Sequence, residues 1–226
     1  MKPLHHDEKA AAAALATSAA SVELHMKTPI DFYFDFSSPY GYLASHKIDA
    51  LAAKHGRDVD WRPMLLGAVF KQTGGAPLTM VPLKGDYSKR DFLRSARYHG
   101  IDDFRMPSPF PIATQAAARI VLWTKAREPE QAPRVAKALY RGYFFDGRDI
   151  SDPDIAADLA AAAGADRAGA RASVDDPAFK EALRHEVDGA IARGVFGSPF
   201  VFADGEPFWG LDRFDQIDRW LAVGGF

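Results

Sequence analysis

The sequence predicts an α/β fold in which two strand-containing segments flank a long helical segment. Apolar runs typical of strands occur near positions 32–36 and 200–209, and alternating apolar residues occur over 59–63. From Gly67 to about Gly194 the apolar residues recur instead at helical spacing, which indicates an all-helical insertion. With 226 residues and 47% hydrophobic content, the chain is long enough to bury a substantial core.

The first half of the sequence predicts a βαβ unit. The apolar strand 32–36 ends just before Pro39, which opens a helix. Apolar residues recur at helical spacing as far as Ala52, so we expect one helix of about four turns that ends near Gly56. The strand 59–63 follows, and a right-handed crossover makes the two strands parallel.

Four helices are predicted inside the insertion, over 112–123, 135–145, 154–163 and about 179–191. An aspartate followed by a proline marks the start of two of them, at Asp152 and Asp176, because the carboxylate accepts from free N–H groups. Gly164 fits the position just after a helix end.

The last part of the sequence predicts a hairpin and a closing helix. Phe200–Ala203 and Pro207–Trp209 flank the dipeptide Asp204-Gly205, which is typical of a tight hairpin turn. Apolar residues at positions 214, 217, 220 and 221 then indicate an amphipathic helix.

Ser38 and Pro39 lie where the first strand meets its helix. A serine before a proline is a preferred helix start, because the hydroxyl accepts from a free N–H and proline lacks the N–H that a helix start leaves unbonded. The same place suits an anion such as a thiolate, since the helix start carries partial positive charge. The chain contains no cysteine, so a thiol there would have to come from a ligand. These residues alone leave both interpretations open.

Four blocks of the sequence resemble the signature segments of the 2-hydroxychromene-2-carboxylate isomerases, a family grouped with the kappa-class glutathione transferases in the DsbA-like branch of the thioredoxin superfamily. The blocks are Phe34–Tyr40, Arg62–Gly67, Gly194–Pro199 and Phe208–Arg213. They occur in the family's order, and the resemblance runs from about Pro29 to the C-terminus. It implies a thioredoxin-like fold, and the predicted order βαβ, helical insertion, ββα matches that plan.

The resemblance also indicates how the chain is divided. We expect a thioredoxin-like domain made of 29–66 and 195–226, with an all-helical domain at 67–194 inserted between its halves. Residues 1–28 contain an alanine-rich stretch and lie outside the resemblance. We interpret them as a flexible N-terminal extension that takes no part in the site.

The resemblance implies glutathione as a cofactor and assigns its site. Ser38 matches the catalytic serine of the family, which donates a hydrogen bond to the glutathione sulfur, whereas relatives commonly carry an apolar residue at the position of Ser37. Ser198-Pro199 resembles a cis-proline turn whose backbone faces the cysteinyl unit. The segment that holds the γ-glutamyl end is matched by Trp209, Gly210, Leu211 and Asp212.

Four positions qualify this assignment. Lys84 matches the lysine that kappa-class transferases place near the glycyl carboxylate of glutathione, whereas without the family it would be interpreted as a solvated loop lysine. Asp212 is expected to pair with the ligand's ammonium group, and it also fits a helix N-cap. Gly75 and Ala113 are candidates for the substrate pocket, but each stands where relatives carry an asparagine, which leaves the second substrate open.

The activity that the resemblance implies is the interconversion of 2-hydroxychromene-2-carboxylate and trans-o-hydroxybenzylidenepyruvate, a step of aromatic hydrocarbon degradation, by reversible addition of the glutathione thiolate. Two alternatives stay open. One is a kappa-like glutathione transferase or peroxidase, and the other is a non-catalytic thioredoxin-fold module that binds thiols or peptides.

The composition restricts the classes of partner that we expect this protein to bind. A net charge of −2 without a long basic run argues against nucleic acid. No apolar stretch has the length of a membrane span, and the lack of cysteine is compatible with the cytoplasm, where we expect the protein. The family suggests a homodimer whose second ligand is a small aromatic carboxylate.

His185-Glu186 begins like a zinc-protease helix but lacks the second histidine, so we predict no metal site.

Overall fold

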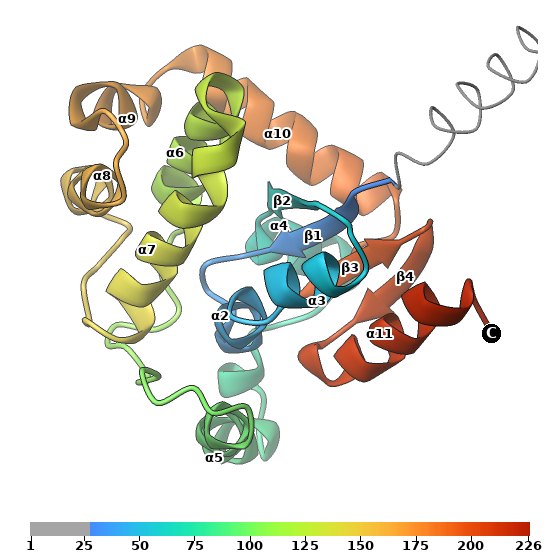
Figure 1. Ribbon diagram of the computed structural model, residues 1–226. Coiled ribbons are helices and arrows are strands. Elements are labelled where there is room, and N and C mark those ends of the chain that lie inside the picture. The colour runs from blue at the N-terminus through green and yellow to red at the C-terminus, as the bar shows by residue number, and fades with distance from the viewer. Residues whose placement is uncertain (1–27) are drawn as a thin grey trace, which may run out of the picture.

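One mixed sheet forms the centre of the computed structural model, which describes residues 28–226 (Figure 1). Its strands are β1 (Ile30–Phe34), β2 (Val59–Pro63), β3 (Phe200–Ala203) and β4 (Glu206–Trp209), in the spatial order β2-β1-β3-β4. β1 runs parallel to β2 and antiparallel to β3, and β3 and β4 form an antiparallel hairpin. The predicted βαβ unit and hairpin are therefore confirmed. The interpretation of 1–28 as a flexible extension lies outside the described residues except at residue 28.

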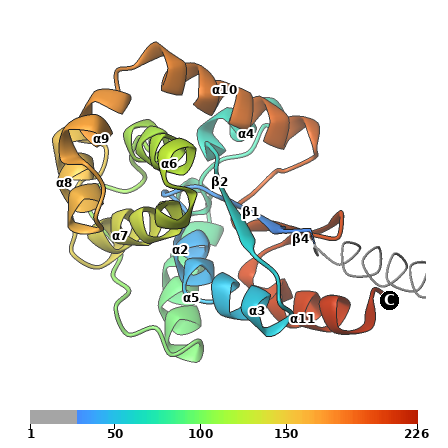
Figure 2. The ribbon, with the colours of Figure 1, turned by 45° about the horizontal axis from the view of Figure 1, so that its top comes forward.

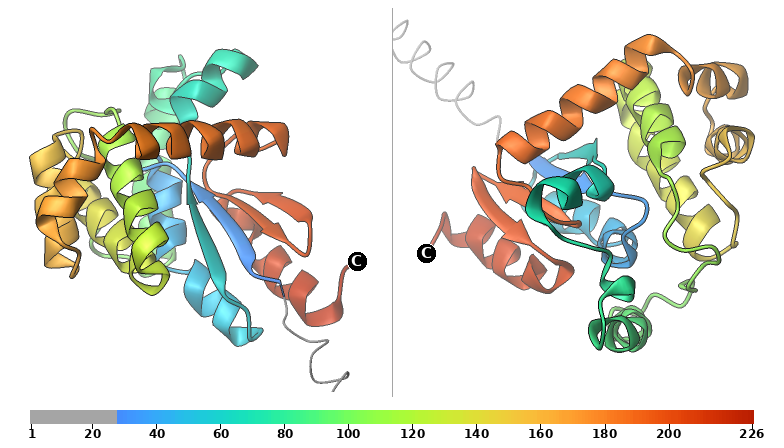
Figure 3. Two further views of the ribbon diagram at one scale, coloured as in Figure 1. Left: turned by 90° about the horizontal axis from the view of Figure 1, so that it is seen from above. Right: turned by 180° about the vertical axis from the view of Figure 1, so that it is seen from behind.

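Helices cover both faces of the sheet, as the two views in Figure 3 show. On one face lie α2 (Pro39–Ser45), α3 (Ile48–Lys54) and α11 (Phe214–Val223). On the other face lie α4 (Leu66–Thr73) and α10 (Pro177–Ala192).

The alternation of side chains along β1 explains this two-sided packing, because successive strand residues point to opposite faces. Phe32 and Phe34 both pack against the ring of Trp61, with ring centroids 4.9 and 5.4 Å away. Tyr33 points to the opposite face, where it is buried beside Val69 of α4. β1 is thus apolar on both sides, as expected for a strand in the middle of a covered sheet.

The remaining helices lie between α4 and α10 in the chain. They are α5 (Lys84–Tyr98), α6 (Gln115–Arg127), α7 (Ala132–Phe144), α8 (Pro153–Ala162) and α9 (Arg167–Ser173). α6 to α9 pack together beside the sheet, whereas α5 lies apart from them, next to α2 (Figure 1 and Figure 2). Three short 3₁₀ turns complete the described elements: η1 (Leu78–Met80), η2 (Pro129–Gln131) and η3 (Leu211–Arg213).

The four helices that the sequence predicts in the insertion are present as α6, α7, α8 and α10, and α11 closes the chain as expected. Asp152 and Asp176 cap α8 and α10 through their carboxylates, and Gly164 follows α8 with a φ of 101°. The sequence does not predict α4, α5 and α9. α5 is strongly polar, and three of its four buried residues are small, namely Gly85, Ser88 and Ala96.

The single helix expected after Pro39 is wrong, because the chain forms α2 and α3 with a break between them. Ser45 Oγ donates to the carbonyl oxygen of Tyr42 at 2.6 Å. The next two amides, of His46 and Lys47, donate three residues back, to Leu43 and Ala44. The turn therefore tightens to i→i−3 bonding, which ends an α-helix.

The helix expected from Ile112 begins three residues later, at Gln115. The carbonyl oxygen of Ile112 accepts a hydrogen bond from Ser37 Oγ at 2.9 Å, and the first helical carbonyl acceptor is that of Thr114. A contact between distant segments thus replaces the first helical turn and turns the loop toward the end of β1.

One buried cluster joins the sheet to the insertion. Phe34 and Trp61 of the sheet share it with Leu139, Tyr140 and Phe144 of α7. The division into a thioredoxin-like domain and a helical domain stays a prediction. Among residues 28–226, none of the helices has the length and apolar character needed to cross a membrane.

Candidate active site

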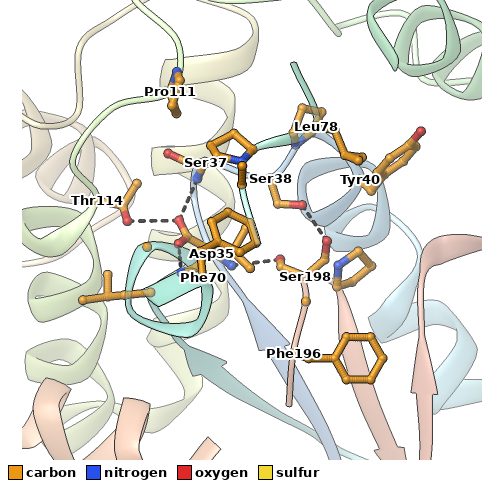
Figure 4. A pocket seen from close by; sticks show the side chains of 18 of the residues that line it. Asp35, Ser37, Ser38, Tyr40, Phe70, Leu78, Pro111, Thr114, Phe196 and Ser198 are labelled. Atoms are coloured by element: carbon orange, nitrogen blue, oxygen red, sulfur yellow. Dashed lines mark hydrogen bonds between the residues drawn. The ribbon is translucent and has the colours of Figure 1, made fainter. Parts of the chain in front are cut away.

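A cavity of about 1300 Å³ opens where β1 turns into α2. Its lining comes from segments that are far apart in the sequence: 35–40, 65–72, 76–79, 110–115, 196–199 and 209–213, with further residues from α5 and α10. Figure 4 shows side chains from several of these segments around Ser38 and Ser198. Small-molecule sites usually measure about 300–1000 Å³, so this cavity has room for more than one ligand.

Ser38 lies at the floor of the cavity and makes two hydrogen bonds of opposite sense. Its Oγ accepts from the backbone N–H of Gly41 at 2.9 Å, which is the N-cap bond of α2. The same oxygen donates its proton to the carbonyl oxygen of Ser198 at 2.7 Å. The cap uses a lone pair and the donation uses the proton, so a helix cap and a donor to an anion are compatible roles.

The side chain of Ser198 is hydrogen-bonded to the residue that follows β1, and its backbone carbonyl group accepts from Ser38. Its Oγ accepts from the backbone N–H of Asp35 at 3.0 Å. The peptide bond between Ser198 and Pro199 is cis, which confirms the prediction made from the resemblance. Tyr140 donates to the carbonyl oxygen of Asp35 at 2.9 Å, and burial raises the pKa of this tyrosine well above its ordinary value.

Asp35 lies behind the two serines and is 3% exposed. Its carboxyl group accepts three hydrogen bonds: from Ser37 N at 2.8 Å, from Leu66 N at 2.6 Å and from Thr114 Oγ1 at 3.0 Å. Burial raises the pKa of Asp35, and the three donors oppose this effect without overcoming it.

The wide part of the cavity is mainly apolar. Its lining includes Phe70, Leu78, Ile112 and Phe196. Tyr40 adds a ring to this wall, and its hydroxyl donates to Asp91 at 2.5 Å. Aromatic and aliphatic walls of this kind suit a planar aromatic ligand.

The rim beside Ser198 is formed by the end of β4 and by η3. Trp209 is 54% exposed, and its ring packs against that of Phe196 with 4.9 Å between centroids. Gly210, with a φ of 106°, is the residue before η3, so the expectation that Asp212 is a helix N-cap is wrong. Asp212 lies inside η3, where its carboxylate is 3.2 Å from the guanidinium group of Arg213.

Comparison with known proteins identifies the family. Residues 29–222 match the family model of the DSBA-like thioredoxin domain. A 2-hydroxychromene-2-carboxylate isomerase of Sphingobium xenophagum is 31% identical over 198 residues, which cover 87% of this chain and 99% of that relative. The chain belongs to the 2-hydroxychromene-2-carboxylate isomerase family of DsbA-like thioredoxin-fold proteins.

Two further relatives place this isomerase family member among enzymes. A solved structure of a 2-hydroxychromene-2-carboxylate isomerase superposes with a TM-score of 0.78 at 25% identity, covering 86% of this chain and 95% of that one. Glutathione S-transferase kappa 2 of Caenorhabditis elegans is 27% identical over 207 residues, covering 85% of this chain and 91% of the relative. The thioredoxin-like fold that the sequence predicts is thereby confirmed.

Most of the residues that the isomerase resemblance assigns to the site lie together. Ser38, Ala113, Ser198, Pro199, Trp209, Gly210, Leu211 and Asp212 all line the cavity. Lys84 and Gly75 are not among its lining residues. Lys84 is the exposed first residue of α5, and Gly75 is exposed just after α4, so contact between either residue and a ligand in this cavity requires a different arrangement of these segments.

Asp35 and Thr114 are site residues that the sequence does not single out. The one available signal is a lone acidic residue in the apolar run 32–36, where a charge is costly to bury without partners. Its partners come from 31 and 79 residues further along the chain, and no local pattern indicates them.

Proposed function

We propose that this protein is a glutathione-dependent isomerase that interconverts 2-hydroxychromene-2-carboxylate and trans-o-hydroxybenzylidenepyruvate. The observation that carries the proposal is the Ser38 hydroxyl, a donor at the floor of a large cavity in a cysteine-free member of this isomerase family. A hydroxyl can hold a thiolate without forming a disulfide with it, which suits a thiol that has to be regenerated.

The cavity fits a tripeptide thiol beside an aromatic acid. Ser198 offers a backbone carbonyl oxygen beside Ser38 Oγ, and the rim segment 209–212 offers main-chain groups and one carboxylate. The apolar wall formed by Phe70, Leu78 and Ile112 suits the aromatic ring. When bound, glutathione would supply a thiolate that adds reversibly to the conjugated ring and leaves after bond rotation.

The Ser38 hydroxyl group has one proton to donate, so it must change its hydrogen-bond acceptor before it can bind a thiolate. In this structure the proton goes to the Ser198 carbonyl oxygen. To hold a thiolate, the O–H would rotate away from that oxygen, and an N–H of the bound peptide would take its place there. The cap bond from Gly41 N stays in place throughout, since it uses only a lone pair of Ser38 Oγ. A hydrogen bond to an anion would lower the pKa of the thiol.

A kappa-like glutathione transferase is the second candidate. The similarity to kappa-class transferases over most of the chain favours it, as does Ala113, which stands where isomerase relatives often carry an asparagine. Gly75 speaks against it, because it stands where the kappa class has an asparagine that contacts the ligand. A non-catalytic thioredoxin-fold module is the third. We also infer a cytoplasmic homodimer. The homodimer rests on the resemblance alone, and the cytoplasm is compatible with the lack of cysteine.

A spectrophotometric assay of 2-hydroxychromene-2-carboxylate with and without glutathione tests the proposal. We expect the substrate to be converted only when glutathione is present, while the amount of glutathione stays constant. Consumption of both compounds would instead indicate a transferase. Binding of glutathione without any turnover would indicate the module, and either result would overturn the isomerase proposal.

A further inference from the structure

The Asp35 carboxyl group connects three segments that surround the cavity. Oδ1 accepts from Ser37 N and Thr114 Oγ1, and Oδ2 accepts from Leu66 N (Figure 4). The donors belong to the turn after β1, to the residue before α6 and to the first residue of α4. All three are uncharged, so the carboxyl group acts here as a hydrogen-bond acceptor rather than as half of an ion pair.

Two of these segments carry the apolar wall of the cavity. α4 begins at Leu66 and places Phe70 one turn later, and the loop that ends at Thr114 carries Pro111 and Ile112. Ser37 strengthens the second connection, because its Oγ donates to the Ile112 carbonyl oxygen at 2.9 Å. Asp35 is therefore linked by one or two hydrogen bonds to both sides of the part of the cavity lined by Phe70, Leu78 and Ile112, which we call the aromatic-binding end.

We infer that Asp35 is a positioning residue that sets the width of this aromatic-binding end by holding α4 and the loop before α6 in register. The identity of the aromatic ligand rests on the proposed function, whereas the positioning itself does not. Asp35 acts through Leu66 and Thr114, because its own oxygens are occupied and it is 3% exposed.

Only a carboxyl group satisfies this set of donors. An asparagine at position 35 has one acceptor oxygen. With that oxygen in the place of Oδ1, its NH₂ group faces Leu66 N–H, and in the flipped orientation the NH₂ group faces Ser37 N–H. In either orientation one partly buried backbone N–H loses its acceptor.

The decisive experiment compares Thr114→Val and Thr114→Ser in steady-state kinetics. Loss of one hydrogen bond corresponds to a factor of about five. We expect Thr114→Val to raise KM for 2-hydroxychromene-2-carboxylate by at least about fivefold. The Kd for glutathione and kcat at saturation should stay within about twofold of wild type, and Thr114→Ser should restore KM.

Thr124→Val is the matched control. Thr124 lies inside α6 and, like Thr114, is buried. Its Oγ1 donates to the Ile120 carbonyl oxygen at 2.9 Å, and it does not line the cavity. This variant should leave KM unchanged. An unchanged KM in folded Thr114→Val, or an equal rise in the Thr124→Val control, would overturn the inference.

A second readout needs no turnover and therefore separates this inference from the proposed function. Amide hydrogen exchange should become faster at Leu66 and across 112–114 in Asp35→Asn, and remain as in wild type in α8 and α9. If wild type lacks isomerase activity but this local change is found, the proposed function fails and the positioning inference stands. Uniform exchange changes, or none in these two segments, would contradict the positioning role.

Discussion

Ser38 accepts one hydrogen bond and donates another, and replacing it with alanine removes both. We expect Ser38→Ala to fold and to isomerise at least about tenfold more slowly, since a hydrogen bond to an anion contributes roughly 1.5–3 kcal/mol. Loss of the N-cap should lower the free energy of unfolding by about 1 kcal/mol. Stopped-flow or steady-state rates at saturating glutathione and a urea titration measure the two effects separately.

Ser37→Ala is the comparison for this prediction. The neighbouring hydroxyl group donates to the Ile112 carbonyl oxygen, whereas it is Ser38 that donates to Ser198, so kcat of Ser37→Ala should stay within a few-fold of wild type. If Ser37→Ala were inactive and Ser38→Ala active, the catalytic hydroxyl group would be that of Ser37 and the assignment to Ser38 would be wrong.

Asp35 predicts an unusual pH dependence of stability. Burial raises the pKa of Asp35 in the folded protein above the ordinary value of 3.8. At pH values between 3.8 and this raised pKa, the folded state therefore binds more protons than the unfolded state. The free-energy contribution of Asp35 is therefore largest below pH 3.8 and is lost as the pH rises toward the native pKa. Relative to the non-titrating Asp35→Asn variant, wild type should lose part of its stability advantage as the pH increases.

Urea unfolding of both proteins at a series of pH values measures this difference. The other titrating groups are common to the two proteins and cancel. An advantage of wild type that grows with pH would mean that the three donors outweigh burial and lower the pKa of Asp35.

At the residue scale, sequence reasoning identified Ser38 and Ser198 because both lie in blocks that resemble a family. It did not single out Asp35, which lies in the same block as Ser38, since a buried hydrogen-bond acceptor leaves no periodic signal and two of its three partners are distant in the chain. Lys84 and Gly75 show the opposite error, because each stands at a position where relatives contact the ligand, yet neither lines the cavity. A resemblance in sequence does not place a residue in a cavity when the conformation of the intervening loop is unknown.

Among the elements, α2 is packed so closely that one of its positions admits only glycine. A Cβ at Gly41 would lie 2.6 Å from Tyr140 Oη and 2.9 Å from Ser198 Oγ. We expect Gly41→Ala to reduce the free energy of unfolding by about 1–3 kcal/mol, a typical result of overpacking. It should also slow isomerisation, because Ser198 and Ser38 must move.

Tyr140→Phe provides the test of that explanation. Removing the hydroxyl takes away the closest contact, so the double variant Gly41→Ala/Tyr140→Phe should be less destabilised than the two single effects added together. Simple additivity in thermal or urea unfolding would rule out this contact as the cause.

The strands and the longest apolar helices were predictable because their periodicity is strong. α5 was not, since a helix whose inner stripe includes Gly85 and Ser88 lacks the apolar pattern that indicates burial. The break after Ser45 and the late start of α6 were also not predictable, because each depends on a single hydrogen bond to a carbonyl oxygen.

For the whole molecule, the buried cluster shared by the sheet and α7 predicts one cooperative unfolding transition. Trp61 reports on the sheet and Trp123 on the insertion, and both are buried. Trp209 and Trp220 also lie outside 67–194, so Trp123 is the one tryptophan of that segment. We expect the fluorescence transitions of wild type and of Trp123→Phe, which lacks this reporter, to coincide with each other and with far-UV circular dichroism. An earlier transition reported by Trp123 would instead show that 67–194 unfolds as a separate domain.

The hydrogen bond from Ser38 to Ser198 joins residues 160 positions apart, and β1 pairs with β3 across a similar span. On a ribosome, β1, α2 and β2 emerge long before 198–209 do. During that interval β1 has one open edge, and the partly made chain is exposed to unwanted strand pairing. The completed cavity can form only after nearly the whole polypeptide has been translated, so nascent chains stalled ahead of β3 should depend on chaperones and should lack any isomerase activity.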